Sequence, residues 1–257
     1  MRRAPVGVPA HVPLVHLMRD GLVEGVHHGS VVVLAPDGSV LFQAGDVHTA
    51  FSPRSAAKPL QAAAMSRLGL SLPPDLLALA AASHSGEPFH LEAAQRILDT
   101  CGCTEDDLRN PADRPFDPVE RAGWFASGQL ARKLAHNCSG KHAAMLATAR
   151  LQGWGAVGYL DPRHPLQRAI AATVEDLTGE RIAHTAVDGC GAPLFSVSLR
   201  GLARAVSWIA RAPQGTPERW KSSPEWLAAV SASRSGGSDS PSRVIAAACI
   251  GLAAERG

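Results

Sequence analysis

The sequence predicts an α+β fold, because an early β-hairpin is followed by a mostly helical middle and a late strand. In the hairpin, the apolar runs Val31–Leu34 and Val40–Phe42 flank a Pro-Asp-Gly-Ser turn. The middle has apolar residues at helical spacing. The late strand is expected over Pro193–Leu199, and no internal repeat is present.

The helices follow in order along the chain. Pro59 is tolerated only near the start of the first helix. The second helix is apolar nearly all round, which indicates a buried helix, and the third is amphipathic. Gly179 closes the fifth, and the proline-rich stretch 110–118 is expected to be a loop. The predicted helices are Ser55–Leu68, Asp75–Ala82, His90–Thr100, Lys141–Leu151, His164–Leu177 and Leu202–Ala210.

Composition excludes several classes of protein. A formal net charge of +2, without a basic run that contains aromatics, gives no reason to expect nucleic-acid binding. The basic start is broken by prolines, so it does not form a signal-peptide core, and no apolar run reaches membrane-spanning length. The five cysteines are scattered and odd in number, which argues against a disulfide framework. We therefore expect a cytoplasmic protein.

The segment Arg54-Ser55-Ala56-Ala57-Lys58 places a hydroxyl and an amine three residues apart. In a helical first turn both side chains would lie on one face. An amine activates a serine only when it is neutral, so burial or a neighbouring cation must lower its pKa. The spacing is that of the Ser-x-x-Lys pair of penicillin-binding proteins and class A β-lactamases. By itself the pattern is weak, and a solvated surface turn is the default interpretation.

A second polar segment, Ser83-His84-Ser85-Gly86-Glu87, directly follows the predicted buried helix. A hydroxyl, an imidazole and a carboxylate at a helix exit can face a cleft, and Gly86 permits a tight turn. A serine-rich helix cap is the alternative.

The third segment, Asn137-Cys138-Ser139-Gly140-Lys141-His142, opens a predicted helix. Its Gly-Lys pair is not a phosphate-binding loop, because Ala135 stands where that fingerprint requires glycine. What remains is a thiol and an amine at a helix N-terminus, where the helix dipole favours the thiolate and the neutral amine. A structural cysteine is the alternative.

The fourth segment is Asp188-Gly189-Cys190-Gly191-Ala192-Pro193, in which two glycines suggest a close backbone approach. Cys138, Lys141 and Cys190 together would offer a metal site, although lysine is an uncommon ligand because it must lose its proton. Spacing alone does not favour zinc. Five histidines without ligand spacing are taken as ordinary: His11, His16, His27, His28 and His48.

In this order the four segments resemble the motifs of the asparaginase II family of the Rhizobium etli type, over roughly residues 12–220. The resemblance implies a serine β-lactamase/glutaminase-like sandwich of helices and a mainly antiparallel sheet. It implies hydrolysis of L-asparagine to L-aspartate and ammonia by paired Ser-Lys groups. A homodimer is a further expectation.

Carried over by position, the resemblance makes Ser55 the nucleophile, Lys58 its base and Ser83 a second active-site serine. It assigns Cys138, Lys141 and Cys190 to a zinc site that orients substrate or stabilises the cleft. Substrate-binding or supporting roles fall to Arg54, Glu87, His142 and Asp188. Arg54 would also lower the pKa of Lys58 by repulsion.

The C-terminal part departs from the family pattern. The family supplies a second lysine there, whereas residues 222–257 contain none. We therefore expect an asparaginase II-like domain over residues 1–230 that lacks C-terminal strands, and a divergent, disordered tail over residues 231–257. Within the tail, Ser231–Ser242 has the composition of a linker and Val244–Ala254 has the pattern of a short apolar helix.

Alternative functions stay open at this point. One is a catalytically impaired or truncated family member that acts at most as an amino-acid- or zinc-binding protein. Another is a different Ser-Lys amidase or peptidase. In each case the expected partner is a small molecule, with no nucleic acid and no membrane.

Overall fold

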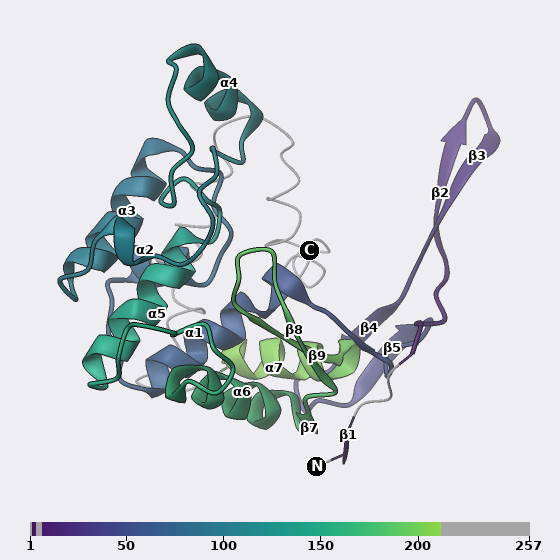
Figure 1. Cartoon of the computed structure of the whole chain (residues 1–257). Helices are drawn as coiled ribbons and strands as arrows, with labels where there is room; N and C mark the ends of the chain where they lie inside the picture. The colour runs from purple at the N-terminus through teal and green to yellow at the C-terminus, as the bar shows by residue number, and fades with distance from the viewer. Residues whose placement is uncertain (1, 4–6, 212–257) are drawn as a thin grey trace.

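A computed structural model describes residues 2, 3 and 7–211 and has the mixed α+β architecture that the sequence predicts (Figure 1). The described helices are η1 Arg54–Ala57, α1 Lys58–Arg67, α2 Pro74–Ala80, α3 Pro88–Asp99, η2 Glu105–Asp107, α4 Pro118–Ala126, α5 Ser139–Leu151, α6 Pro165–Thr178 and α7 Leu199–Arg211. The described strands are β1 Arg2–Arg3, β2 Val12–Arg19, β3 Leu22–Gly29, β4 Val31–Leu34, β5 Val40–Ala44, β6 Ala50–Phe51, β7 Glu180–Arg181, β8 His184–Val187 and β9 Pro193–Ser198.

The strands of the described part form small, mainly antiparallel sheets. Strand β9 lies between β6 and β8, and both pairings are antiparallel. The predicted hairpin is confirmed as β4 and β5, whereas β1 and β7 form a short parallel pair. The predicted tail, with its helix Val244–Ala254, lies outside the described residues.

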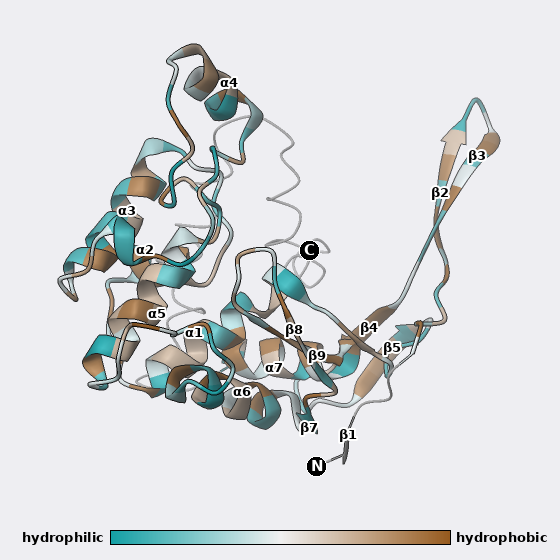
Figure 2. Cartoon of the chain, in the orientation of Figure 1, coloured by the Kyte–Doolittle hydropathy of each residue, from teal (hydrophilic) through white to brown (hydrophobic). Residues whose placement is uncertain are grey.

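The helices build the core and determine where the polar motifs meet. Helix α1 packs against α5 and α6, and α3 packs against α5. The main cluster of buried side chains draws on these helices and on β9. Figure 2 shows hydrophobic and hydrophilic stretches alternating along the helices. Prolines begin α2, α3, α4 and α6, where the missing amide hydrogen removes no helical hydrogen bond. Gly179 ends α6 in the left-handed conformation, as predicted.

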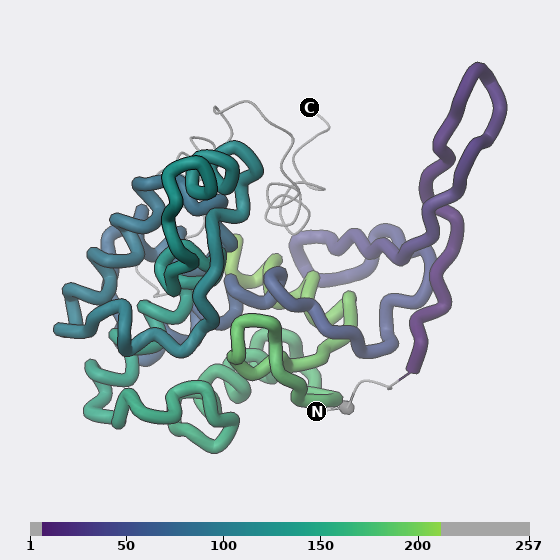
Figure 3. Tube along the Cα trace, turned by 45° about the horizontal axis from the view of Figure 1, so that its top comes forward, coloured from purple at the N-terminus to yellow at the C-terminus, as the bar shows by residue number. Residues whose placement is uncertain are grey.

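The largest difference from the sequence prediction is the β2–β3 hairpin, which Figures 1 and 3 show standing away from the rest of the molecule. This hairpin was not predicted, because prolines and histidines interrupt the apolar alternation that is typical of strands. Register shifts at Pro13/Val15 and Leu17/Met18 further mask the pattern. Helix α4 and strand β8 were not predicted either. Within the described residues, no helix is long and apolar enough to cross a membrane.

Candidate functional site

The four polar segments of the sequence meet where α1 and α5 begin. The ammonium group of Lys58 lies at the centre of this meeting point. Its Nζ donates to Ser83 Oγ at 2.8 Å, to the Ala82 carbonyl at 3.0 Å and to the Asn137 carbonyl at 3.3 Å. One buried side chain therefore ties α1 to the segment after α2 and to the turn before α5.

Ser55 lies one turn before this centre, in the short 3₁₀ helix η1, and is half-buried. The α-helix begins at Lys58 rather than at Ser55, so the two residues share a first turn only through η1. The backbone amide of Lys58 donates to the Ser55 carbonyl, whereas in the described part of the chain the hydroxyl partner of the Lys58 side chain is Ser83. The helical spacing had suggested Ser55 as this partner.

Lys58 is only 1 % exposed, and this burial lowers the pKa of its ammonium group. The thiol of Cys138 opposes the shift, while the positive charge of Lys141 adds to it. The like charge that acts on Lys58 is thus Lys141, whereas Arg54 was expected in this role. Arg54 instead pairs with Asp188, with 3.2 Å between Nη2 and Oδ1. The result is an amine whose pKa lies below its ordinary value.

Hydrogen bonds of His84 link the segment that carries Ser83 to the start of α5. Its backbone amide donates to the Asn137 carbonyl at 3.2 Å, and its Nε2 hydrogen bonds with Ser139 Oγ at 2.8 Å. Burial holds the pKa of His84 well below its usual range, so the ring is neutral. Glu87 lies farther along the same segment and accepts a hydrogen bond from Ser85 Oγ at 3.0 Å.

Two buried thiols and a buried amine form the second part of the site. Lys141 Nζ donates to Cys190 Sγ at 3.0 Å, and Cys138 and Cys190 lie in one buried cluster with Ala192. The hydrogen bond between Cys138 and Cys190, aided by the charges of Lys58 and Lys141 and opposed by burial, lowers the pKa of Cys138 to about 5. That hydrogen bond and burial raise the pKa of Cys190. Of the two thiols, Cys138 therefore has the lower pKa.

Cys138, Lys141 and Cys190 are the ligands that the resemblance implies for a zinc ion. In residues 2, 3 and 7–211 no group of three or more His, Cys, Asp or Glu side chains forms a metal cluster. Cys138 and Cys190 nevertheless offer two soft sulfur donors beside the Lys141 amine. Burial opposes a charge on Lys141, but the two sulfurs outweigh it and raise the pKa of the amine. The donor set fits zinc on the condition that binding releases a proton from Lys141.

The remaining predicted residues surround these two groups. Asp188 accepts from the Cys190 thiol, with 3.6 Å between Oδ2 and Sγ, besides pairing with Arg54. Burial opposes ionisation of Asp188, but the Gly189 amide and the nearby cations outweigh it and lower its pKa. His142 hydrogen bonds through Nδ1 to the hydroxyl of Tyr159 at 2.8 Å. Burial lowers the pKa of His142 to about 4, so its ring is neutral.

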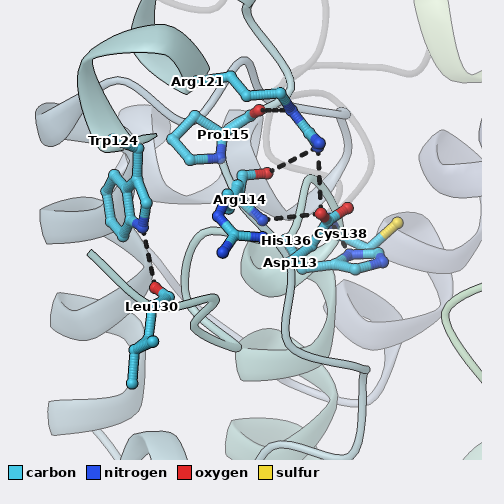
Figure 4. A network of polar contacts seen from close by, with 8 residues as sticks. All are labelled: Asp113, Arg114, Pro115, Arg121, Trp124, Leu130, His136 and Cys138. Carbon is cyan, nitrogen blue, oxygen red and sulfur yellow. Dashed lines mark hydrogen bonds and ion pairs between the residues drawn. The ribbon is translucent and has the colours of Figure 1, made fainter. Parts of the chain in front are cut away.

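A network of polar contacts joins α4 to the loop that precedes it and lies beside the turn that leads into α5 (Figure 4). The guanidinium of Arg121 donates to the Pro115 carbonyl at 2.8 Å and to Asp113 Oδ1 at 3.1 Å. Nearer the thiols, the Cys138 amide donates to Nδ1 of His136 at 3.1 Å. The contact with His136 lies within the turn that presents Cys138.

Sequence reasoning assigned no role to several residues that build the site. They act through backbone carbonyls or through long-range side-chain contacts, which no local motif shows. For Ser139, the available signal in the sequence was a polar residue at the start of an otherwise apolar helix. The residues are Asn137, Ser139, His136 and Tyr159.

Comparison with known families matches the L-asparaginase II family model to residues 15–242. This match includes all four polar segments and ends within the stretch 231–257 that the sequence analysis set apart. A comparison with curated proteins gives no significant match.

Proposed function

Because the chain belongs to the L-asparaginase II family, we propose that it hydrolyses L-asparagine to L-aspartate and ammonia by acyl transfer to a serine. The observation that carries this proposal is the buried Lys58, whose pKa is lowered by burial and whose Nζ lies 2.8 Å from Ser83 Oγ. A lysine that is neutral when needed is what a serine nucleophile requires.

In the proposed reaction Ser55 attacks the carbon of the side-chain amide. Lys58 and Ser83 carry the protons: Lys58 accepts the proton of Ser55, and Ser83 passes a proton to the departing ammonia. Water then hydrolyses the aspartyl ester, and the same groups move the protons in reverse. The hydrogen bond between Lys58 and Ser83 supports this relay, since a proton can move along it directly.

Charged groups beside Ser55 would bind the amino-acid part of the substrate. Arg54 is next to Ser55 and its side chain is 66 % exposed, so its guanidinium is available for a substrate carboxylate. Asp188 and Glu87 offer carboxylates for the substrate ammonium group, and His142 supports the site from its buried position. We propose that binding exchanges the contact between Arg54 and Asp188 for contacts with the zwitterionic substrate.

Cys138, Lys141 and Cys190 would hold the zinc ion. When bound, it would stabilise the cleft by joining the β8–β9 loop to α5, and it would orient substrate. The homodimer, the cytoplasmic location and the Rhizobium etli-type assignment stay predictions of the sequence.

A second assignment of roles follows from the same contact. Because Lys58 donates to Ser83 in the described structure, Ser83 is the alternative nucleophile, with Ser55 in the supporting role. The two assignments predict different acylated residues, so experiment can separate them.

The test is release of ammonia and L-aspartate from L-asparagine by the full chain, with L-glutamine as a second substrate. Ser55→Ala should reduce the rate by at least about a thousandfold, because the nucleophile is lost. Ser66→Ala removes a hydroxyl from the other end of α1, outside the proposed chemistry, and should leave the rate within about twofold. Equal rates for wild type and Ser55→Ala would overturn the assignment of Ser55.

A further inference from the structure

A second pair of cysteines lies outside the proposed active site, in the turn that follows α3. Cys101 and Cys103 flank Gly102, whose φ is +64°. The amides of Cys101 and Cys103 both donate to the Leu98 carbonyl, each at 3.1 Å. Two amides can reach one carbonyl only if the chain folds back on itself, so the turn is tight.

The tight turn keeps the two cysteines within disulfide range. Consecutive alpha carbons are about 3.8 Å apart, so residues two apart in a bent chain lie closer than about 7 Å. Disulfides join alpha carbons about 4.4–6.8 Å apart. The thiols make only weak competing contacts: Cys101 Sγ donates to the Leu98 carbonyl at 3.2 Å, and Cys103 Sγ to the Cys101 carbonyl at 3.9 Å.

The two sulfurs have different surroundings, as in a reactive cysteine and its resolving partner. Cys103 is 3 % exposed, and its side chain interacts with the guanidinium of Arg150, an exposed residue of α5 whose pKa this contact raises. A cation beside a sulfur stabilises its thiolate. Cys101 is half-buried. Its burial, and to a smaller extent its hydrogen bond with Cys103, raises the pKa of its thiol to about 12. Cys101 therefore keeps its proton.

We propose that Cys101 and Cys103 are a reversible oxidation site, which forms an intramolecular disulfide when the protein meets a hydroperoxide. The Cys103 thiolate attacks one oxygen of the peroxide and breaks the O–O bond. This gives a sulfenic acid on Cys103, and the other oxygen leaves as an alcohol or as water. The Cys101 sulfur then attacks the Cys103 sulfur, and the hydroxyl group leaves as water with the proton of Cys101.

The sum of these steps converts two thiols and one hydroperoxide into a disulfide, an alcohol and water. Two electrons pass from the sulfurs to the peroxide. No residue of the proposed active site takes part, so the oxidation site is independent of the proposed asparagine hydrolysis and can be tested without an activity assay.

The chain offers a direct readout in its tryptic peptides. Cleavage after Arg96 and Arg109 gives the peptide 97–109, whose only cysteines are Cys101 and Cys103. Cys138 falls in the peptide 134–141 and serves as an internal control. The full chain is treated with hydrogen peroxide, alkylated with iodoacetamide, digested and analysed by mass spectrometry.

The expected result is that the peptide 97–109 loses two hydrogens and both alkylation sites, and that a dithiol reductant restores them. Cys101→Ser should stop the reaction at a sulfenic or higher acid on Cys103. Arg150→Met should slow disulfide formation by about tenfold, since it removes the cation beside Cys103.

The proposal is overturned if the peptide 97–109 stays doubly alkylated at peroxide concentrations that oxidise the Cys138 peptide. It is overturned equally if Cys101 or Cys103 is oxidised but joins another cysteine of the chain. A circular dichroism spectrum of each variant that matches the wild type establishes that the comparison is made on folded protein.

Discussion

Replacing Gly86 by alanine should destabilise the protein and disturb the segment that carries Ser83. Gly86 has a φ of +91°, a conformation that residues with a Cβ rarely adopt. A Cβ at this position would lie 2.7 Å from Pro115 Cα and 2.8 Å from Pro115 Cβ. Both atoms are rigid, so the two segments must move apart.

The surrounding contacts resist that movement. Arg121 donates to the Pro115 carbonyl at 2.8 Å, and the Asp117 amide donates to the Ser85 carbonyl at 2.8 Å. The left-handed conformation costs a residue with a Cβ about 1–2 kcal/mol. Overpacking adds about 1–3 kcal/mol. We therefore expect Gly86→Ala to lower the free energy of unfolding by about 2–5 kcal/mol.

The assay is urea unfolding, with Gly38→Ala as the matched control. Gly38 has a φ of +84° but no atom within 4 Å of its built Cβ, so it isolates the conformational cost of about 1–2 kcal/mol. The overlap with Pro115 should make Gly86→Ala less stable than this control by about 2 kcal/mol, or about 4–8 °C in melting temperature. Equal losses in the two variants would refute the reasoning about Pro115.

Three further predictions concern packing, pH and metal. Gly140→Ala would place a Cβ 2.6 Å from Leu79 Cγ and should lower the free energy of unfolding in urea by about 1–3 kcal/mol. Gly123→Ala, whose Cβ would have no atom within 4 Å, should not lower it. Burial lowers the pKa of His90 from 6.5 to about 4, so the unfolded chain binds the proton first. The contribution of neutral His90 to the free energy of unfolding is therefore complete above pH 6.5 and falls by about 3 kcal/mol towards pH 4. His90→Gln should flatten this part of the pH profile of the unfolding free energy, and an unchanged profile would contradict the assignment. Cys190→Ser should lower the zinc content of dialysed protein, measured by elemental mass spectrometry, while Cys103→Ser should leave it unchanged.

Local patterns predicted most of the helices and the β4–β5 hairpin, because apolar spacing and turn residues act within a few positions. The helix predicted over 164–177 is α6, and the predicted C-terminal glycine closes it. The β2–β3 hairpin escaped prediction because its strands bury little against the rest of the chain, so no alternation of apolar and polar residues is required of them.

For the site, the sequence identified the four segments but not the contacts between them. The bond from Lys58 to Ser83 depends on how α1 packs beside the end of α2, which no spacing along the chain specifies. The same holds for Lys141 and Cys190, which are far apart in sequence. The lowered pKa of Lys58 likewise follows from its burial in the folded protein, since an exposed lysine keeps its ordinary pKa.

The most direct test of the proposed chemistry is to identify the serine that carries the aspartyl group during turnover of L-asparagine. The reaction is quenched in acid, and the protein is digested and analysed by mass spectrometry. Trypsin separates Ser55, in the peptide 55–67, from Ser83, in the peptide 68–96, because cleavage between Lys58 and Pro59 is blocked. The account predicts an added aspartyl mass on the peptide 55–67 of the wild type and none in Ser55→Ala. An aspartyl mass on the peptide 68–96, or turnover with neither peptide modified, would contradict it.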